Sequence, residues 1–213
     1  GEMAARFGFG ETFNFGLPGE NRGLIPTPAW KRKTFGQAWH AGETLITSIG
    51  QGFILCTPLQ LAVMTCRLVN GGRSVSPRLL RNENAKILKA KSLQLNPQHL
   101  RTVLKGMNKV VNGPHGTARK VVNQNTKFQF GGKSGSVQVK RISLDERESG
   151  KLKNKDRPWH ERDHAMFVAF APLKAPRYVA SVVVEHGGEG STMAAPIARD
   201  ILAETLRLNP SKL

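Results

Sequence analysis

The sequence contains no run of about 18 apolar residues, the minimum for a membrane-spanning helix. It also has no charged-then-apolar leader of the kind that directs secretion. Only two cysteines occur, Cys56 and Cys66, and a continuous helix between them would separate them beyond the reach of a disulfide. The chain therefore carries no predicted membrane span, and we expect two buried thiols.

Acidic residues are scarce, since 15 Asp and Glu oppose 32 Lys and Arg and leave a formal net charge of +17. Such a charge suggests a polyanion-binding protein. Aromatic residues, however, make up only 7%, and the tryptophans do not alternate with lysines as a base-stacking platform requires. The densest charged stretch, residues 140–163, also interleaves both signs. We predict a solvated basic surface that binds no nucleic acid, and a non-catalytic basic binding module stays open as an alternative.

Regular structure is predicted mainly after residue 56. Residues 1–56 carry many glycines and prolines with only short apolar runs, so we interpret them as loops and extended pieces within one domain spanning residues 1–213. Thr57 and Pro58 predict the start of a buried helix that Asn70-Gly71-Gly72 ends. A second helix begins at Asn96-Pro97 and has one apolar stripe: Leu100, Val103, Leu104, Met107 and Val111.

The second half of the chain predicts an antiparallel sheet. After a turn-rich stretch at 112–116, strand-like runs cover 128–139, 165–171 and 178–185. Pro172 and Pro176 bracket the last connection, which favours a hairpin. A final helix begins between Ser191 and Pro196 and runs through Ile197, Ile201 and Leu206, whereas residues 73–95 suggest a surface strand or connector. The fold class predicted is α+β, an antiparallel sheet flanked by helices.

Residues 131–139 read Gly-Gly-Lys-Ser-Gly-Ser-Val-Gln-Val, a glycine-flanked Lys-Ser-Gly at the head of a β-branched run. Taken alone, the triplet also suits a bend into a strand with an exposed lysine. Other segments accompany it in a fixed order: Gly16 to Glu20, Gly23 to Thr27, Trp30-Lys31, Ile49 to Gly52, Thr57 to Ala62, Asn70 to Gly72, Gly116-Thr117-Ala118, Asp163-His164, Phe167 to Pro172 and Gly187-Gly188. Together they resemble the C-terminal part of the transpeptidase domain of class B penicillin-binding proteins, the rod-elongation branch in particular.

Two motifs of that family are missing from the sequence. Its nucleophilic serine belongs to Ser-x-x-Lys and a second catalytic element is Ser-x-Asn, but no serine here has lysine three residues on or asparagine two residues on. We expect both motifs upstream of Gly1, together with a membrane anchor. The resemblance therefore implies only the C-terminal portion of a penicillin-binding, β-lactamase-like fold, with one wall of the active site and without its nucleophile.

The resemblance implies a role for each of residues 133–136. Lys133 supplies positive potential and relays protons, and the hydroxyl of Ser134 donates a hydrogen bond to the substrate's terminal carboxylate. Gly135 lets the acyl substrate approach the strand closely. The main-chain N–H of Ser136 provides one oxyanion donor, so a serine serves as well there as the family's usual threonine. Ser134 lacks the Gly-x-Ser-x-Gly setting of a nucleophile.

A second chemistry is suggested by His160-Glu161-Arg162-Asp163-His164, which matches the zinc-peptidase pattern His-Glu-x-x-His, with Glu185 at a distance that a third ligand could occupy. That chemistry requires both histidines on one face of a helix. Pro158 precedes the pattern and a β-rich run starts directly after His164, so we expect a polar loop entering a strand and keep the zinc peptidase as an alternative.

The resemblance implies a peptidoglycan D,D-transpeptidase that cross-links stem peptides through an acyl-serine and is inhibited by β-lactams. A D,D-carboxypeptidase or β-lactamase-type hydrolase is the related alternative. No cofactor is implied. Expected partners are stem peptides ending in D-Ala-D-Ala, β-lactam antibiotics, the upstream half of the same domain and cell-wall elongation proteins. The implied location is the periplasmic face of a bacterial inner membrane.

Overall fold

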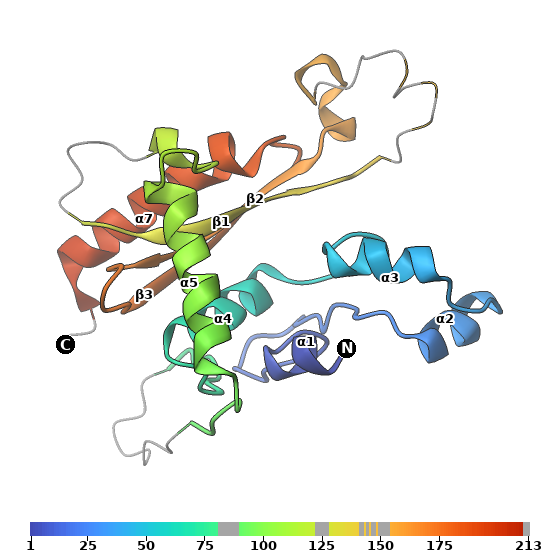
Figure 1. Cartoon of the computed structure of the whole chain (residues 1–213), viewed down its shortest axis with the longest axis horizontal. Coiled ribbons are helices and arrows are strands. Elements are labelled where there is room, and N and C mark those ends of the chain that lie inside the picture. The colour runs from blue at the N-terminus through green and yellow to red at the C-terminus, as the bar shows by residue number, and fades with distance from the viewer. Residues whose placement is uncertain are drawn as a thin grey trace. The chain divides into compact units, whose positions relative to one another are not determined.

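The computed structural model describes residues 1–80, 90–121, 128–140, 143, 145, 148 and 154–210 (Figure 1). The chain divides into two compact units, Gly1–Leu95 and Asn96–Leu213. Within the described residues, no helix combines the length and apolar character needed to cross a bilayer.

Among its described residues, the first unit contains four helices, α1 (Glu2–Arg6), α2 (Pro28–Phe35), α3 (Ala41–Ser48) and α4 (Pro58–Val69). Our prediction of loops and extended pieces over residues 1–56 missed the first three. Thr27 accepts a hydrogen bond from the N–H of Trp30 at 3.1 Å, and Gly36 ends α2 in the left-handed conformation, so local capping defines this helix without an apolar stripe.

An ion pair between a buried lysine and a half-buried glutamate joins α2 to α3. Lys31 has only 3% of its surface exposed, and its Nζ lies 2.6 Å from Oε1 of Glu43. Glu43 also accepts a hydrogen bond from the N–H of His40. The hydrogen bond from Lys31, followed by that from His40, lowers the pKa of Glu43. The Glu43 carboxylate therefore connects the start of α3 with Lys31 of α2.

Helix α4 begins where its cap predicted. Thr57 Oγ1 accepts from the N–H of Gln60 at 3.1 Å, and Gln60 Oε1 accepts from the N–H of Thr57 at 3.0 Å, which forms a capping box. Of its apolar side chains only Val63 is fully buried, because the buried positions otherwise hold Gln60, Thr65 and Arg67. Cys56 and Cys66 are free thiols that are half-buried rather than buried as expected, and desolvation raises the pKa of both.

Gln60 joins the first 22 residues to α4. Its Nε2 donates to the carbonyls of Glu11 at 3.0 Å and Arg22 at 2.9 Å, and its side chain is almost fully buried. Gln60→Ala leaves these carbonyls and the Thr57 N–H without partners, so we expect the free energy of unfolding to fall by about 2–4 kcal/mol. Urea denaturation followed by tryptophan fluorescence measures this loss. Gln98→Ala, at an exposed site, is the control, and equal midpoints for the two variants would contradict the prediction.

The described part of the region after α4 is a connector, one of the two forms predicted for residues 73–95. Within the described part of residues 73–95 we find an isolated bridge between Arg73 and Ser92 rather than a strand. The remainder of that predicted connector, residues 81–89, lies outside the described residues.

The second unit is built on an antiparallel sheet of β1 (Gly131–Val137), β2 (His164–Ala171) and β3 (Tyr178–Val184), in the order β1-β2-β3. Gly135 pairs with Met166, and Ala169 pairs with Ala180. The predicted hairpin between the last two strands is confirmed. The first strand starts at Gly131 rather than at the predicted residue 128, although the Gln129 carbonyl still accepts a hydrogen bond from the N–H of Leu173.

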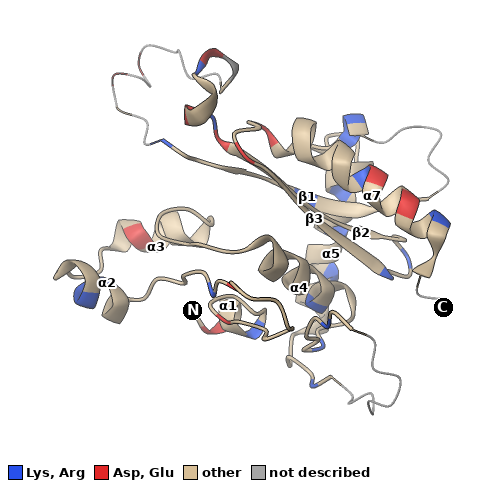
Figure 2. Cartoon of the chain, turned by 180° about the vertical axis from the view of Figure 1, so that it is seen from behind, with Lys and Arg blue, Asp and Glu red and all other residues tan. Residues whose placement is uncertain are grey.

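Helices cover both faces of this sheet. Figures 1 and 2 show α5 (Pro97–Asn112) on one face and α7 (Ala195–Leu208) on the other. A π-helical turn, Gly190–Ala194, leads into α7 and packs on β1 and β2. The core joins apolar residues of β2 and β3 to two alanines and a leucine of α7: Phe167, Ala169, Ala180, Val182, Ala195, Ala198 and Leu202. The predicted α+β class is confirmed.

The buried faces of both helices hold some, but not all, of the apolar residues named from the sequence. Met107 and Val111 of α5 are buried, whereas Val103 is 46% exposed, so only the C-terminal half of that stripe joins the core. Ile197 and Ile201 of α7 are exposed, because the face of the helix that packs in the core carries Ala198 and Leu202. Figure 2 shows Lys and Arg spread along α2, α5 and α7 rather than gathered on one element.

Candidate active site

The Lys-Ser-Gly triplet lies on β1, an edge strand of the described sheet. Two glycines before the triplet permit close packing with β2. A Cβ on Gly131 would lie 2.6 Å from the Phe170 ring, and one on Gly132 would lie 2.5 Å from the Phe167 ring. These close contacts determine how closely β1 packs on the aromatic side chains of β2, and therefore the position of residues 133–136.

The free edge of β1 carries the backbone groups of alternate residues. The carbonyl of Phe130 accepts a hydrogen bond from Asn112 Nδ2 at 2.9 Å, and the carbonyl of Ser134 accepts one from Lys133 Nζ at 2.5 Å. Because N–H and C=O of every second residue in a strand point to the same side, both contacts indicate that residues 130–136 direct their even-numbered backbone groups away from β2. The N–H of Ser136 belongs to this set.

The four predicted site residues occupy consecutive positions with different exposures. Lys133 and Ser136 are exposed, whereas Ser134 and Gly135 are half-buried. The Lys133 side chain folds back over the strand to reach the Ser134 carbonyl. The strand thus presents a cation, two hydroxyls and main-chain donors within four consecutive residues, the set of groups that binds carboxylates and carbonyl oxygens.

Sequence reasoning missed two residues that contact this strand. Thr117 Oγ1 lies 3.3 Å from Ser134 Oγ. Gly190, in the turn before α7, lies so close behind the strand that an added Cβ would be 2.4 Å from the Gly135 carbonyl oxygen and 2.2 Å from that of Met166. In the sequence, Thr117 belongs to Gly116-Thr117-Ala118, a segment that carries the family resemblance but whose residue pattern indicates no role for the threonine. Nothing in the sequence around Gly190 indicated this contact.

A hollow of about 400 Å³ lies beside Thr117. It is formed by the C-terminal half of α5 and the turn that follows, and it is lined by Gly106, Lys109, Val110, Gly113, Pro114, His115, Gly116 and Thr117. Thr117 therefore belongs both to this hollow and to the surroundings of Ser134.

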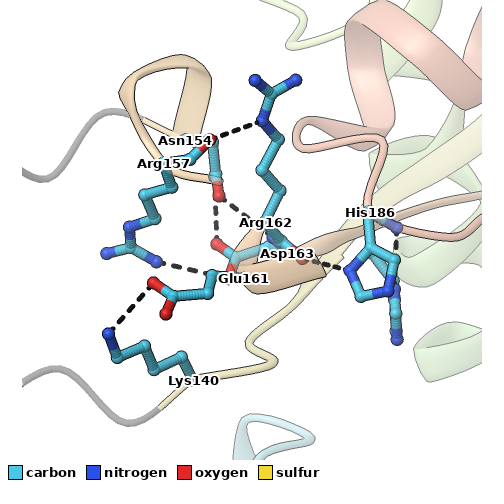
Figure 3. Close-up of polar contacts among 8 residues, drawn as sticks. Lys140, Asn154, Arg157, Glu161, Arg162, Asp163 and His186 are labelled. Carbon is cyan, nitrogen blue, oxygen red and sulfur yellow. Dashed lines mark hydrogen bonds and ion pairs between the residues drawn. The ribbon is translucent and has the colours of Figure 1, made fainter. Parts of the chain in front are cut away.

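The zinc-peptidase pattern does not form a helix. His160 belongs to a single 3-10 turn, η3 (Trp159–Glu161), whereas His164 is the first residue of β2. His164 Nδ1 accepts from the N–H of His186 at 2.9 Å, and Glu161 pairs with Lys140 at 3.0 Å (Figure 3). Across the described ranges, His, Cys, Asp and Glu form no group of three suited to a metal ion. The pattern instead belongs to a polar network where the chain enters β2.

The chain was compared with known protein families, curated proteins and solved structures, and the results are consistent with the sheet described above. The penicillin binding protein transpeptidase domain family matches residues 1–203. The chain belongs to this family.

Within the family, the chain is similar to the peptidoglycan D,D-transpeptidase MrdA of Haemophilus influenzae, at 35% identity over 92% of the chain and 31% of that protein. Two solved structures are similar as well. Pseudomonas aeruginosa PBP2 in complex with WCK 5153 has 37% identity and a TM-score of 0.79, over 95% of this chain and 42% of that one. PBP2 of Helicobacter pylori, solved in complex with MreC, has 32% identity and a TM-score of 0.80, over 96% and 35%. The chain spans about a third of the length of its curated relatives.

Proposed function

We propose that residues 133–136 form one wall of the active site of a peptidoglycan D,D-transpeptidase, and that the nucleophilic serine comes from a segment outside residues 1–213. The observation that carries this proposal is the Lys-Ser-Gly triplet on a strand edge in a chain of the transpeptidase family. In this reaction the serine attacks the carbonyl of the penultimate D-Ala and expels the terminal D-Ala. The acyl group then passes to an amine on a neighbouring peptidoglycan strand.

Each group at the edge has a place in that reaction. Lys133 provides positive potential for the substrate carboxylate and for proton transfer near the nucleophile. The Ser134 hydroxyl donates to the same carboxylate. Gly135 keeps the strand accessible to the acyl group, and the Ser136 N–H donates to the developing oxyanion. Because β-lactams carry a carboxylate and a strained amide in a similar arrangement, we propose that they acylate the same serine.

We also propose the location and partners of the longer protein. The similarity to an MrdA enzyme and to two PBP2 structures supports a role in wall synthesis at the periplasmic face of the bacterial inner membrane. A PBP2 from H. pylori has been solved with MreC, which supports elongation proteins as partners. The net charge of +17 suits a surface near anionic lipids or wall polymers.

The test is intact-mass analysis of the longer protein after incubation with benzylpenicillin. We expect a single penicilloyl adduct, located by peptide mapping on a serine outside residues 1–213, and no effect of a zinc chelator on its formation. A preparation that shows a cooperative melting transition but forms no adduct would contradict the proposal. An adduct on a serine within the chain would contradict the placement of the nucleophile.

A further inference from the structure

Thr117 brings a further hydroxyl to the Lys-Ser-Gly strand from outside the sheet. It lies in the connection between α5 and η1 (Arg119–Val121), 17 residues before Ser134. Its Oγ1 is 3.3 Å from Ser134 Oγ, and its side chain is exposed. An exposed pair of hydroxyls contributes little to folding because water can replace either partner. The contact is therefore better explained by what it does to Ser134.

The backbone on both sides of Thr117 is tightly held. Gly116 is wedged against α5, where an added Cβ would lie 2.4 Å from the carbonyl oxygens of Lys109 and Val110. On the other side, the N–H of Ala118 donates to the Val110 carbonyl at 2.9 Å, and Ala118 is 1% exposed in the core. Thr117 is thus fixed between two anchored neighbours, so its hydroxyl stays within reach of the strand.

The direction of the hydrogen bond between Thr117 and Ser134 decides whether the Ser134 hydroxyl proton is available to a substrate. A hydroxyl has one proton and two lone pairs, and its proton rotates to suit its neighbours. If Ser134 donates to Thr117, its proton is not available to a substrate. If Thr117 donates to Ser134, the Ser134 proton is free, and the accepted bond strengthens its donation to an anion. A substrate carboxylate placed against Ser134 selects this second arrangement, because only it leaves the Ser134 proton free for the carboxylate.

We infer that Thr117 is a positioning residue: it donates to Ser134 Oγ and directs the Ser134 proton at the carboxylate of a stem peptide or β-lactam. This inference rests on the proposed function, since it presupposes that Ser134 binds that carboxylate. It extends that function to a residue outside the strand, and it assigns a role to the Gly-Thr-Ala segment, whose glycine and alanine hold the threonine in place.

The test compares acylation of the longer protein by benzylpenicillin and by its methyl ester, which lacks the carboxylate charge. The variants are Thr117→Val, which removes the hydroxyl at nearly constant shape, Thr117→Ser, which keeps it, Ser134→Ala, and the double variant Thr117→Val/Ser134→Ala. We expect Thr117→Val to lower the second-order acylation constant about three- to tenfold for the free acid and to change it little for the ester. Thr117→Ser should restore the rate, and the double variant should be no slower than Ser134→Ala alone.

Each other outcome speaks against the inference. Equal losses with acid and ester would show that Thr117 acts through general structure, and so would additive losses in the double variant. A wild-type rate in Thr117→Val, with Ser134→Ala impaired, would overturn the inference and leave the proposed function intact. Lys133→Ala is measured alongside these variants. Wild-type rates in both Ser134→Ala and Lys133→Ala would instead overturn the assignment of the Lys-Ser-Gly wall, and the inference with it.

Discussion

Replacing Lys133 with alanine in the longer protein should slow acylation by benzylpenicillin by roughly a hundred- to a thousandfold, the loss seen when one preorganised electrostatic group is removed from an acyl-transfer site. The side chain lies exposed on the strand edge and contacts only the adjacent Ser134 carbonyl among the described interactions. Its removal therefore takes away charge from the site without opening a cavity. We expect the melting temperature to stay within about a degree or two of wild type, because exposed substitutions rarely change stability by more than about 0.5 kcal/mol.

Lys174→Ala is the matched control for Lys133. It removes the same charge from an exposed position in the connection between β2 and β3 of the same unit. A general effect of the +17 net charge on an anionic β-lactam would slow both variants alike, whereas a site effect slows only Lys133→Ala. Stopped-flow acylation with a fluorescent penicillin measures both rates, and equal rates for the two variants would refute the role of Lys133.

The parts of the fold that could be predicted from the sequence are those specified by short-range chemistry. Thr57 and Pro58 define the start of α4, and the two prolines after β2 define the hairpin. The same reasoning could have found α2, because Thr27 and Pro28 repeat the cap of α4. It was missed because Lys31, Arg32 and Lys33 leave no apolar stripe, and because the burial of Lys31 depends on Glu43, twelve residues away.

The residues of the candidate site likewise fall into those that the sequence could locate and those that depend on tertiary packing. Residues 133–136 could be found because they share one strand, and consecutive residues need no tertiary information to be placed together. Thr117 and Gly190 could not be assigned, since their contacts with the strand depend on how α5 and α7 pack on the sheet. The histidines of the zinc-like pattern show the converse: their spacing suits a helix, but the pairing of β2 with its neighbours places His164 in a strand.

Gly190→Ala should damage both stability and acylation, although the change adds one methyl group. An alanine Cβ would lie 2.2 Å from the Met166 carbonyl oxygen and 2.4 Å from that of Gly135, and both are backbone atoms that no side-chain rotation can move. The start of α7 or the Lys-Ser-Gly strand must therefore shift. Overpacking of this kind costs about 1–3 kcal/mol of unfolding free energy. A displacement of the strand by about 1 Å would cost on the order of a hundredfold in rate.

Gly106→Ala separates this steric effect from the general effect of replacing a glycine. Gly106 lies in α5 with nothing within 4 Å of an added Cβ, so alanine should stabilise that helix by about 0.5–1 kcal/mol and leave acylation unchanged. Both variants are measured well below their melting temperatures, so that a lower rate reports the folded protein. If the Gly190→Ala protein has a lower melting temperature but acylates at the wild-type rate, the added methyl group has displaced α7 and not β1. A loss of rate larger than the loss of folded protein would show that Gly190 sets the position of β1 in the active site.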